Sequence, residues 1–514
     1  MSPADGGADP PQPYEGMYDP LVAWNARILD PARVVRREGD RLDTTLYVAD
    51  SLLVVGDPTG AEVTDIIGWL REDKHLAARP DEVNARNFEA GAGTDRSTPW
   101  VTPLRLTPEP GFAVVVDAWG LLQEYRSLID DRRQADAAGA DGGREPRRID
   151  NPTEVGLDHL MYADILGQTK TVGGTKTVGG TKTVGGTKTV GGGVVDEYAS
   201  AGLGGRTPVA YLGPAPLRSP DVADRPTVVL LDTGIGEHPW LVDGVEVRPG
   251  TAVEPEKTGI IHHRLVGVID DFSGHGTFVA GLVRQACPDA DLLMIQVMGA
   301  DGFVSETMMI NELDRLAIDH VTGARPVAAV SLSFGYYLES EDASKTASLA
   351  AALQNLSDHE VVVIVSAGND ATTRPMYPAA FSTTIENVVS VGARNPNGSV
   401  ALFSNAGDWV DTYWPGAQVL STAPRTFDGS VQPSARTRWA GQHRESLDPD
   451  DFSAQYLPAP AEEADVSPAG FALWSGTSFA APAFLGFCLQ RHLAGQRAVR
   501  LREVVGDVAA RYRR

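Results

Sequence analysis

The strongest constraint on the fold is an alternation of short apolar runs and helical patterns from about residue 205 onward. The apolar runs are PTVVLLD, DLLMIQVM, ARPVAAVSLSFG, EVVVIVSAGN and ENVVSVGA. Apolar residues recur at helical spacing in HGTFVAGLVRQA, TMMINELDRLAIDHVT, SKTASLAAALQNLSD and TSFAAPAFLGFCLQRHL. Strands that are apolar on both faces and alternate with helices form a parallel sheet covered on each side. We therefore expect residues 205–514 to form an α/β domain with a mostly parallel sheet.

The region before this domain has a different pattern. Residues 1–40 are rich in Pro, Gly and Asp without periodicity, which predicts a disordered arm. Residues 41–165 mix the strand-like runs TTLYVADSLLVVGD, VTPLRLT and FAVVVDAW with the helical runs TGAEVTDIIGWLRED and LLQEYRSLIDDRR. This mixture predicts a smaller α+β unit, and a chain of 514 residues has room for two folded units.

Residues 166–204 lie between the two units and contain four tandem copies of TKTVGG, at residues 169–192. A six-residue period is compatible with a β-solenoid, but each copy offers a single Val to bury. One Val per repeat does not offset about 1–2 kcal/mol of backbone entropy for each ordered residue. We therefore interpret this segment as a flexible linker.

Charge and composition limit the classes of function. The net charge of −24 argues against a nucleic-acid binder, because no basic surface stands out to neutralise phosphates. The N-terminus lacks the pattern of a secretory signal, and no apolar run is long enough to cross a membrane. The only cysteines, Cys287 and Cys488, lie in apolar helical patterns typical of buried thiols. We therefore expect a cytoplasmic protein, with its oligomeric state left open.

Three reactive side chains are expected near the sheet, where functional groups gather at the carboxyl ends of parallel strands. Asp232 ends VVLLDTGIG, His275 lies between glycines in GHGTFVAGLV, and Ser478 opens the helix of SGTSFAAPAF. Each also has an ordinary structural interpretation, respectively a turn residue, a buried histidine and a helix N-cap. Their occurrence in one α/β domain, each beside glycine, favours a shared catalytic site.

These segments, LLDTGIGEHP, GHGTFVAGL and SGTSFAAP, resemble the three signature segments of the subtilisin-like serine proteases. VSLSFG and VVVIVSAGND resemble the substrate-binding strand and the oxyanion segment of that family. FSNAGDWVDTYWPGAQVLST resembles the stretch before its nucleophile, so the similarity covers about residues 225–495 in the family's order.

The resemblance implies a serine endopeptidase that acts on protein or peptide substrates. In it Ser478 attacks the scissile carbonyl to form an acyl-enzyme, His275 is the general base and acid, and Asp232 orients the imidazole. Asn369 stabilises the oxyanion together with the backbone N–H of Ser478.

The resemblance also assigns substrate-binding residues. Ser333, Phe334 and Gly335 match the strand that pairs with the substrate backbone, and Ala367 and Gly368 wall the primary specificity pocket. Some positions depart from the family pattern: Phe278 replaces a frequent histidine, Phe479 a usual methionine and Phe334 a usual leucine. The polar, Pro-rich residues 422–470 are interpreted as a surface insertion near the site.

No cofactor is required by this chemistry, and no metal site is predicted. The pair His262–His263 lacks a carboxylate or cysteine at matching spacing, so ordinary surface histidines are expected. Relatives often bind calcium, for which Asp270 and Asp271 are candidates by charge and place alone.

Two questions stay open at this level. A non-catalytic peptide-binding module on the same fold is the alternative function, although a decayed enzyme should have lost one of its four active-site residues. Residues 41–165 fit equally a prosegment, which would be cut from the chain within the repeats or residues 194–224, and an accessory domain.

Overall fold

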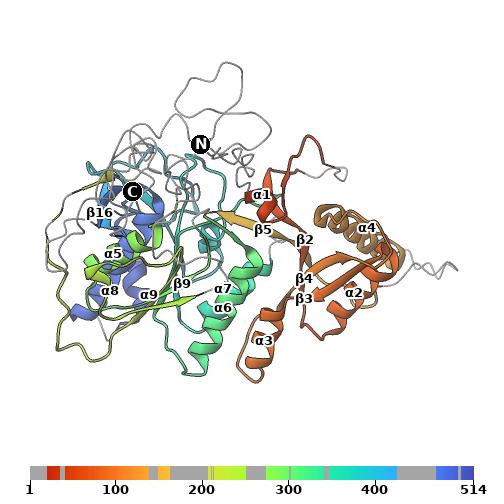
Figure 1. Cartoon of the computed structure of the whole chain (residues 1–514), viewed down its shortest axis with the longest axis horizontal. Helices are drawn as coiled ribbons and strands as arrows, with labels where there is room; N and C mark the ends of the chain where they lie inside the picture. The colour runs from red at the N-terminus through yellow and green to blue at the C-terminus, as the bar shows by residue number, and fades with distance from the viewer. Residues whose placement is uncertain are drawn as a thin grey trace, which may run out of the picture.

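The computed structural model describes residues 20–34, 41–137, 149–162, 207–209, 211, 213–249, 272, 274–299, 302–340, 347–424, 470–495 and 499–513 (Figure 1). The repeats, the pair His262–His263 and the residues Asp270 and Asp271 lie outside this part of the chain. Most of the 422–470 segment does so too, and the interpretations given to these segments stay predictions.

The second half of the chain contains a seven-stranded sheet in which every neighbouring pair is parallel. Across the sheet the strands are β14 (Thr412–Pro415), β13 (Val388–Arg394), β12 (Val362–Ser366), β11 (Ala329–Leu332), β7 (Thr227–Asp232), β9 (Asp291–Gln296) and β8 (Val245–Pro249). The central strands correspond to the apolar runs of the sequence. The predicted α/β class is therefore confirmed.

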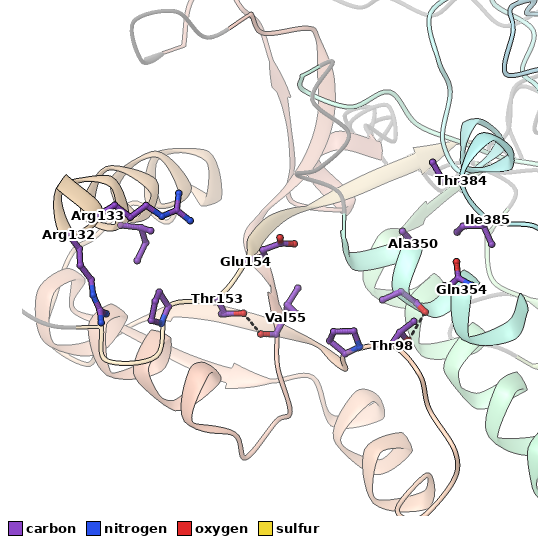
Figure 2. A pocket seen from close by; sticks show the side chains of 14 residues that line it. Val55, Thr98, Arg132, Arg133, Thr153, Glu154, Ala350, Gln354, Thr384 and Ile385 are labelled. Atoms are coloured by element: carbon purple, nitrogen blue, oxygen red, sulfur yellow. Dashed lines mark hydrogen bonds between the residues drawn. The ribbon is translucent and has the colours of Figure 1, made fainter. Parts of the chain in front are cut away.

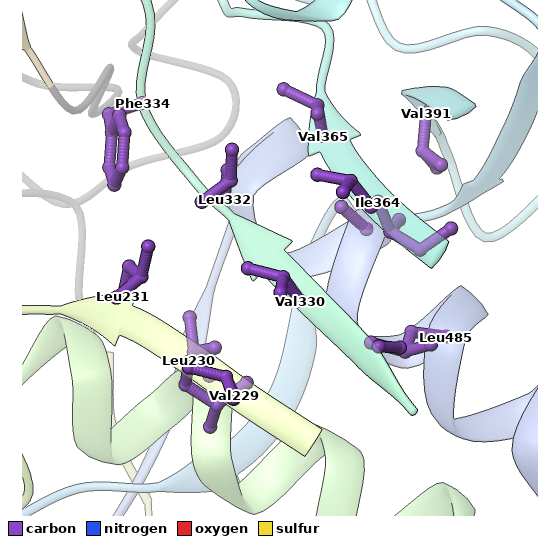
Figure 3. Packing of buried hydrophobic residues seen from close by; sticks show 14 of the residues in the cluster. Val229, Leu230, Leu231, Val330, Leu332, Phe334, Ile364, Val365, Val391 and Leu485 are labelled. Carbon is purple, nitrogen blue, oxygen red and sulfur yellow. The ribbon is translucent and has the colours of Figure 1, made fainter. Parts of the chain in front are cut away.

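Helices cover both faces of this sheet (Figure 1). On one face lie α5 (His275–Ala286), α8 (Thr477–Gly495) and α9 (Leu501–Arg511), and on the other lie α6 (Glu306–Val321) and α7 (Ala347–Asp358). Figure 3 shows Val330 of β11, Ile364 of β12 and Leu485 of α8 within one buried core. All three are fully buried, so apolar burial on both faces holds the central strands in place.

Smaller elements complete this half. An antiparallel sheet has the order β15 (Val419–Thr422), β16 (Phe471–Trp474) and β6 (Thr207–Pro208). Two short 3₁₀ helices are η1 (Pro239–Leu241) and η4 (Ala379–Thr383). The strand β16 leads through two residues to α8, and it brings Trp474 next to the start of that helix.

The first half of the chain is the expected α+β unit with an antiparallel sheet. Its strands are β1 (Ala26–Leu29), β2 (Thr45–Val55), β3 (Leu76–Pro80), β4 (Val101–Pro108) and β5 (Val155–Tyr162). Its helices are α1 (Pro20–Ala23), α2 (Ala61–Lys74), α3 (Glu82–Ala90) and α4 (Ala118–Ala137). A separate apolar core lies between this sheet and the helices α2 and α4.

Two expectations for this unit are wrong. Part of the arm predicted at residues 1–40 is ordered, because β1 pairs antiparallel with β2 and Leu29 is fully buried. The run FAVVVDAW is not a strand: residues 112–117 have no regular structure and α4 begins at Ala118. Val114 and Val116 of this segment are partly buried against the core. Their burial accounts for the apolar residues of the run without pairing to another strand.

The two halves share one sheet. The strand β10 (Phe303–Ser305), from the second half, pairs antiparallel with β5 and forms the edge of the six-stranded sheet of the first half. Figure 1 shows β5 leaving the N-terminal unit and running toward the parallel-sheet domain. The N-terminal unit is thus joined to the second half by main-chain hydrogen bonds as well as by side chains.

Buried polar contacts reinforce this junction along α6. Arg96 pairs with Asp314 at 2.7 Å, and the Asp314 side chain is fully buried. Asn87 donates to the carbonyl of Asn311 at 2.8 Å, and the side chain of Asn311 donates to Asp81 at 2.9 Å. Buried polar groups that find partners only across a junction favour the docked arrangement.

Candidate active site

Three elements of the parallel-sheet domain deliver the predicted triad residues to one place. Asp232 is the last residue of β7, His275 the first residue of α5, and Ser478 the second residue of α8. All three are buried, with at most 1% of each residue exposed. The loop after β7 and the start of α5 approach closely, because a Cβ on Gly276 would lie 2.2 Å from the carbonyl oxygen of Gly234. Glycine is therefore required beside His275.

The imidazole of His275 is held by Asp232. Its Nδ1 lies 2.7 Å from Oδ1 of Asp232, and the same oxygen accepts the backbone N–H of Thr233 at 2.7 Å. Because an ionised carboxylate only accepts, Nδ1 carries the proton and Nε2 of a neutral ring is an acceptor. The buried Nε2 has no hydrogen-bond partner in the described part of the chain. A base with this tautomer is ready to receive a proton.

Ser478 is tied to the end of β11. Its hydroxyl donates to the carbonyl of Ser333 at 3.3 Å, and the hydroxyl of Ser333 donates to the carbonyl of Ser478 at 3.2 Å. The contact between the hydroxyl and the imidazole is thus not made here. Such contacts are often loose until a substrate binds, and a rotation about χ1 redirects the hydroxyl.

Aromatic rings surround the imidazole of His275. The ring centroids of Phe479, Trp474 and Phe272 lie 5.3, 5.7 and 6.3 Å from it. Phe278 packs on Phe479 with ring centroids 4.5 Å apart, so two of the three departures from the family pattern join one cluster. This cluster keeps the surroundings of the base apolar.

Asn369 follows β12 and faces the start of α8. Its side-chain oxygen accepts the backbone N–H of Thr477 at 2.8 Å and the hydroxyl of Thr477 at 2.9 Å. These two contacts fix the orientation of the amide, since only the oxygen accepts. The amide nitrogen lies beside Gly476, where an added Cβ would be 3.5 Å away. An N–H donor is therefore placed two residues from Ser478.

The remaining predicted residues follow the neighbouring strands. Ser333, Phe334 and Gly335 continue from β11, and the Phe334 side chain is buried in the core. Ala367 and Gly368 continue from β12 and lead directly to Asn369. Gly368 has a φ of 97° and lies against Met376 and Asn405, which leaves no room for a side chain. All nine predicted site residues thus lie at the carboxyl ends of β7, β11 and β12 or at the starts of α5 and α8.

The edge at Gly335 is occupied by the N-terminal unit. Tyr162, the last residue of β5, donates to the carbonyl of Gly335 and accepts its N–H, both at 3.0 Å. Along its other edge β5 pairs with β10, with Met161 opposite Val304. An extended chain therefore already lies where the sequence predicts that a substrate backbone binds.

A model of the subtilase family matches residues 223–488. The chain belongs to the subtilase family. Over 213 residues it is 29% identical to subtilisin BL of Lederbergia lenta, across 40% of this chain and 68% of that protein. It is also 29% identical over 177 residues to the major intracellular serine protease of Bacillus subtilis (strain 168), across 32% of this chain and 51% of that protein. The family and these relatives support serine endopeptidase activity, and they confirm the predicted resemblance.

Among solved structures, a cold adapted subtilisin-like serine proteinase is similar to this subtilase. The sequence identity is 19% and the TM-score is 0.36, across 55% of this chain and 81% of that one.

One cavity of this subtilase lies away from the triad. A space of about 790 Å³ separates the N-terminal unit from α7 and η4, and none of the nine predicted site residues lines it. Figure 2 shows Arg132 and Arg133 on the side of the N-terminal unit and Gln354 on the other side. Thr98 closes one end by donating to the carbonyl of Ala351 at 3.0 Å. The cavity is a gap in the packing between the halves and holds none of the catalytic groups.

Within the described residues, no group of three or more His, Cys, Asp and Glu side chains is arranged to hold a metal ion. In the same part of the chain, no helix is both long and apolar enough to cross a bilayer.

The sequence did not single out Glu306, Glu339 or His159 as functional residues, yet they form a buried cluster beside Gly335. Glu306 opens α6, Glu339 follows Gly335 by four residues, and His159 belongs to β5. No spacing links them in the sequence. Asp158 directly precedes His159, and Glu341 and Asp342 follow Glu339, so no local pattern distinguishes these residues in the sequence.

Proposed function

We propose that this subtilase hydrolyses peptide bonds with Ser478 as nucleophile, His275 as general base and Asp232 as the orienting carboxylate. The observation that carries the proposal is the buried pair of Asp232 and His275, which leaves Nε2 as an acceptor in the same site as Ser478. An imidazole held in this tautomer can take the hydroxyl proton, and a lone buried histidine could not be kept in it.

The proposed reaction has two half-reactions. His275 Nε2 takes the proton of the Ser478 hydroxyl as Oγ bonds to the scissile carbonyl carbon. The oxyanion accepts hydrogen bonds from the Asn369 amide and the Ser478 backbone N–H. When the carbon–nitrogen bond breaks, the imidazolium gives its proton to the leaving amine, and an acyl-enzyme remains. Water then repeats the sequence, with His275 again as base, and releases the acid.

We further propose that a substrate backbone pairs with Ser333, Phe334 and Gly335, and that Ala367 and Gly368 line the space for one substrate side chain. The pairing of Tyr162 with Gly335 supports the first part, because it shows that this edge accepts an extended chain through both its N–H and its carbonyl. Ala367 and Gly368 support the second by their position, since they directly precede Asn369.

The N-terminal unit is proposed to be a prosegment-like inhibitor of the cleft. A substrate cannot pair with Gly335 while Tyr162 does so, and β10 is engaged by β5 at the same time. A strand continued in the register of β5 would reach Ser333, which contacts Ser478, two residues after Tyr162. Self-cleavage is therefore expected after Tyr162, within residues 163–224. We also propose a cytoplasmic location, since two relatives are named intracellular serine proteases.

A serine-directed fluorophosphonate tests the proposal on the full chain. We expect time-dependent labelling at Ser478, found by mass mapping of the labelled peptide, and none in Ser478→Ala. Ser475→Ala is the matched control, because Ser475 lies in the same segment and should leave labelling intact. The wild type should also shorten by cleavage after Tyr162, whereas Ser478→Ala stays at full length. A folded wild type that never labels would leave the fold as a peptide-binding module.

A further inference from the structure

Two buried carboxylates of the parallel-sheet domain follow the two segments that pair with β5. Glu306 directly follows β10, which pairs with β5, and Glu339 lies four residues beyond Gly335, which pairs with Tyr162. Each is only 2% exposed. Two carboxylates removed from water need cationic or hydrogen-bonding partners.

The imidazole of His159 lies between these carboxylates. Its Nδ1 is 2.8 Å from Oε2 of Glu306, and its Nε2 is 3.0 Å from Oε2 of Glu339. Both ring nitrogens must donate to ionised carboxylates, so the ring is an imidazolium. Burial alone would lower its pKa, but the hydrogen bonds to Glu306 and Glu339 raise the pKa of His159 to about 10. The pair therefore holds a cation.

The parallel-sheet domain builds most of this site by itself. The second oxygen of Glu306 accepts the hydroxyl of Tyr336 at 3.2 Å and the backbone N–H of Leu349 at 3.3 Å. The ring of Tyr336 stacks on His159 with centroids 4.7 Å apart. Besides the His159 ring, the N-terminal unit adds a hydrogen bond from Arg126 to Glu339 and one from the backbone N–H of His159 to Glu306, both at 3.4 Å. Glu306 is thus oriented by residues of its own domain, and the ring of Tyr336 lies beside it. This arrangement suits a cationic side chain supplied by another segment.

The position of His159 on β5 defines what an incoming chain must carry. Side chains alternate along a strand, so His159 and Met161 point to the same face. Met161 is fully buried in the apolar core of the parallel-sheet domain, and Tyr162 pairs with Gly335. A chain bound in this register presents a cation, then two residues later an apolar side chain, and then the residue that pairs with Gly335.

We propose that Glu306 and Glu339 form a subsite of the cleft for the cationic side chain of an extended peptide, three residues before the one that pairs with Gly335. This inference rests on the proposed function. In the full chain His159 fills the subsite. When β5 leaves, a substrate with a cation at that position replaces it and restores the partners of both carboxylates. A neutral side chain there leaves two neighbouring negative charges unpaired, which disfavours binding.

The test uses the full chain with His159→Gln, so that its own imidazolium is absent from the subsite. Peptides that copy residues 155–164, long enough to reach past Tyr162 toward Ser478, carry His, Lys or Gln at position 159. They compete with fluorophosphonate labelling of Ser478 at about pH 6, where a free imidazole is largely protonated. The concentration that halves the labelling rate should be about tenfold lower, or less, for the His and Lys peptides than for the Gln peptide.

A second protein adds Glu306→Gln and Glu339→Gln to the same chain. Glutamine keeps the oxygen that accepts from Tyr336 and Leu349, so the site retains its internal contacts without its charge. The preference for cationic peptides should then fall to within about twofold. Glu360→Gln is the matched control, because Glu360 is an exposed carboxylate paired with Arg500, and the preference should persist there.

Each result decides the inference. Equal protection by all three peptides, no protection by any, or a preference that survives the paired substitution would overturn it. Failure of the proposed function looks different, because Ser478 would then not label in any of these proteins, with or without peptide.

Discussion

His275 and His159 are both buried imidazoles, but their surroundings give them opposite properties. His275 has one carboxylate at Nδ1, aromatic rings around it and no partner at Nε2 among the described residues. His159 has a carboxylate at each nitrogen and a tyrosine ring against one face. One acidic partner orients a base that can gain a proton, and two acidic partners hold a proton already gained.

The comparison separates two uses of buried charge in this protease. In the proposed mechanism, the charge of Asp232 is matched only when His275 becomes an imidazolium during the reaction. At the second site, the charges of Glu306 and Glu339 are matched already by docking of β5. One carboxylate beside the imidazole therefore fits the proposed catalytic role of His275, and two carboxylates fit the proposed binding role of the site around His159.

The largest effect on activity is expected from a change at Asp232, because a single carboxylate oxygen holds the imidazole of His275. In Asp232→Asn the new amide can donate toward Nδ1, which moves the ring proton to Nε2 and removes the base. We expect kcat to fall by about 10⁴-fold, a scale known for serine proteases of this family, with KM little changed. Steady-state kinetics on a peptide substrate, with the active fraction counted by fluorophosphonate titration, measures this.

Asp411→Asn is the matched control for that change. Asp411 is a partly buried carboxylate that accepts a backbone N–H from Ser390 at 2.9 Å, and no histidine of the described residues pairs with it. The kcat of the Asp411→Asn variant should stay close to that of the wild type. A loss of less than about tenfold in Asp232→Asn would show that His275 does not depend on its carboxylate, and the contrast with His159 would fail.

The second prediction concerns the pH dependence of docking. The pKa of His159 is raised from 6.5 to about 10, so its stabilisation is complete below about pH 6.5 and is lost as the pH rises through 10. Glu339 has the opposite sign. Burial would raise its pKa, but His159 and Arg126 lower the pKa to about 2 from 4.5, so its share is lost as the pH falls from 4.5 to 2. Both contributions are complete only from about pH 4.5 to 6.5.

Thermal unfolding of the full chain measures this window. In a Ser478→Ala background, which prevents processing, His159→Gln should lower the midpoint by about 5 °C or more at pH 5 to 6. The difference should shrink as the pH rises and vanish near 10. The groups that face the ring, Glu306, Glu339, Arg126 and Tyr336, stay the same in both proteins. A difference that does not vary with pH would mean that His159 acts by shape alone.

The triad region could be predicted from the sequence because its signals are local. Apolar runs predict the strands, and the glycines beside Asp232, His275 and Ser478 indicate where the backbone must turn or approach closely. The family resemblance then supplied Asn369, whose contacts with Thr477 no local pattern encodes. The parallel sheet and the positions of the predicted site residues at its carboxyl edge follow from these signals.

The recognition site could not be predicted in this way, because its contacts join distant segments. His159 meets Glu306 and Glu339 across 147 and 180 positions of the chain. The pairing of β5 with β10 depends on the docking of two units, and neither strand has a strong pattern of its own. The same limit explains β1, which the surrounding Pro, Gly and Asp residues concealed, and the run FAVVVDAW, whose alternation found no strand to pair with.

The smallest predicted effect on activity concerns the aromatic rings around His275. In the proposed mechanism His275 becomes an imidazolium, and the centroid of its ring lies 5.7 Å from that of Trp474. Contact of a cation with an aromatic ring is worth about 0.5–1 kcal/mol, so Trp474→Leu should lower kcat by about two- to fivefold. Trp414→Leu is the control, because Trp414 also packs on aromatic rings of α8, those of Phe484 and Phe487, and not on His275. Equal losses in both variants would assign the effect to packing of α8, whereas a loss confined to Trp474→Leu would show that the rings around His275 stabilise its charge, as the carboxylates do for His159.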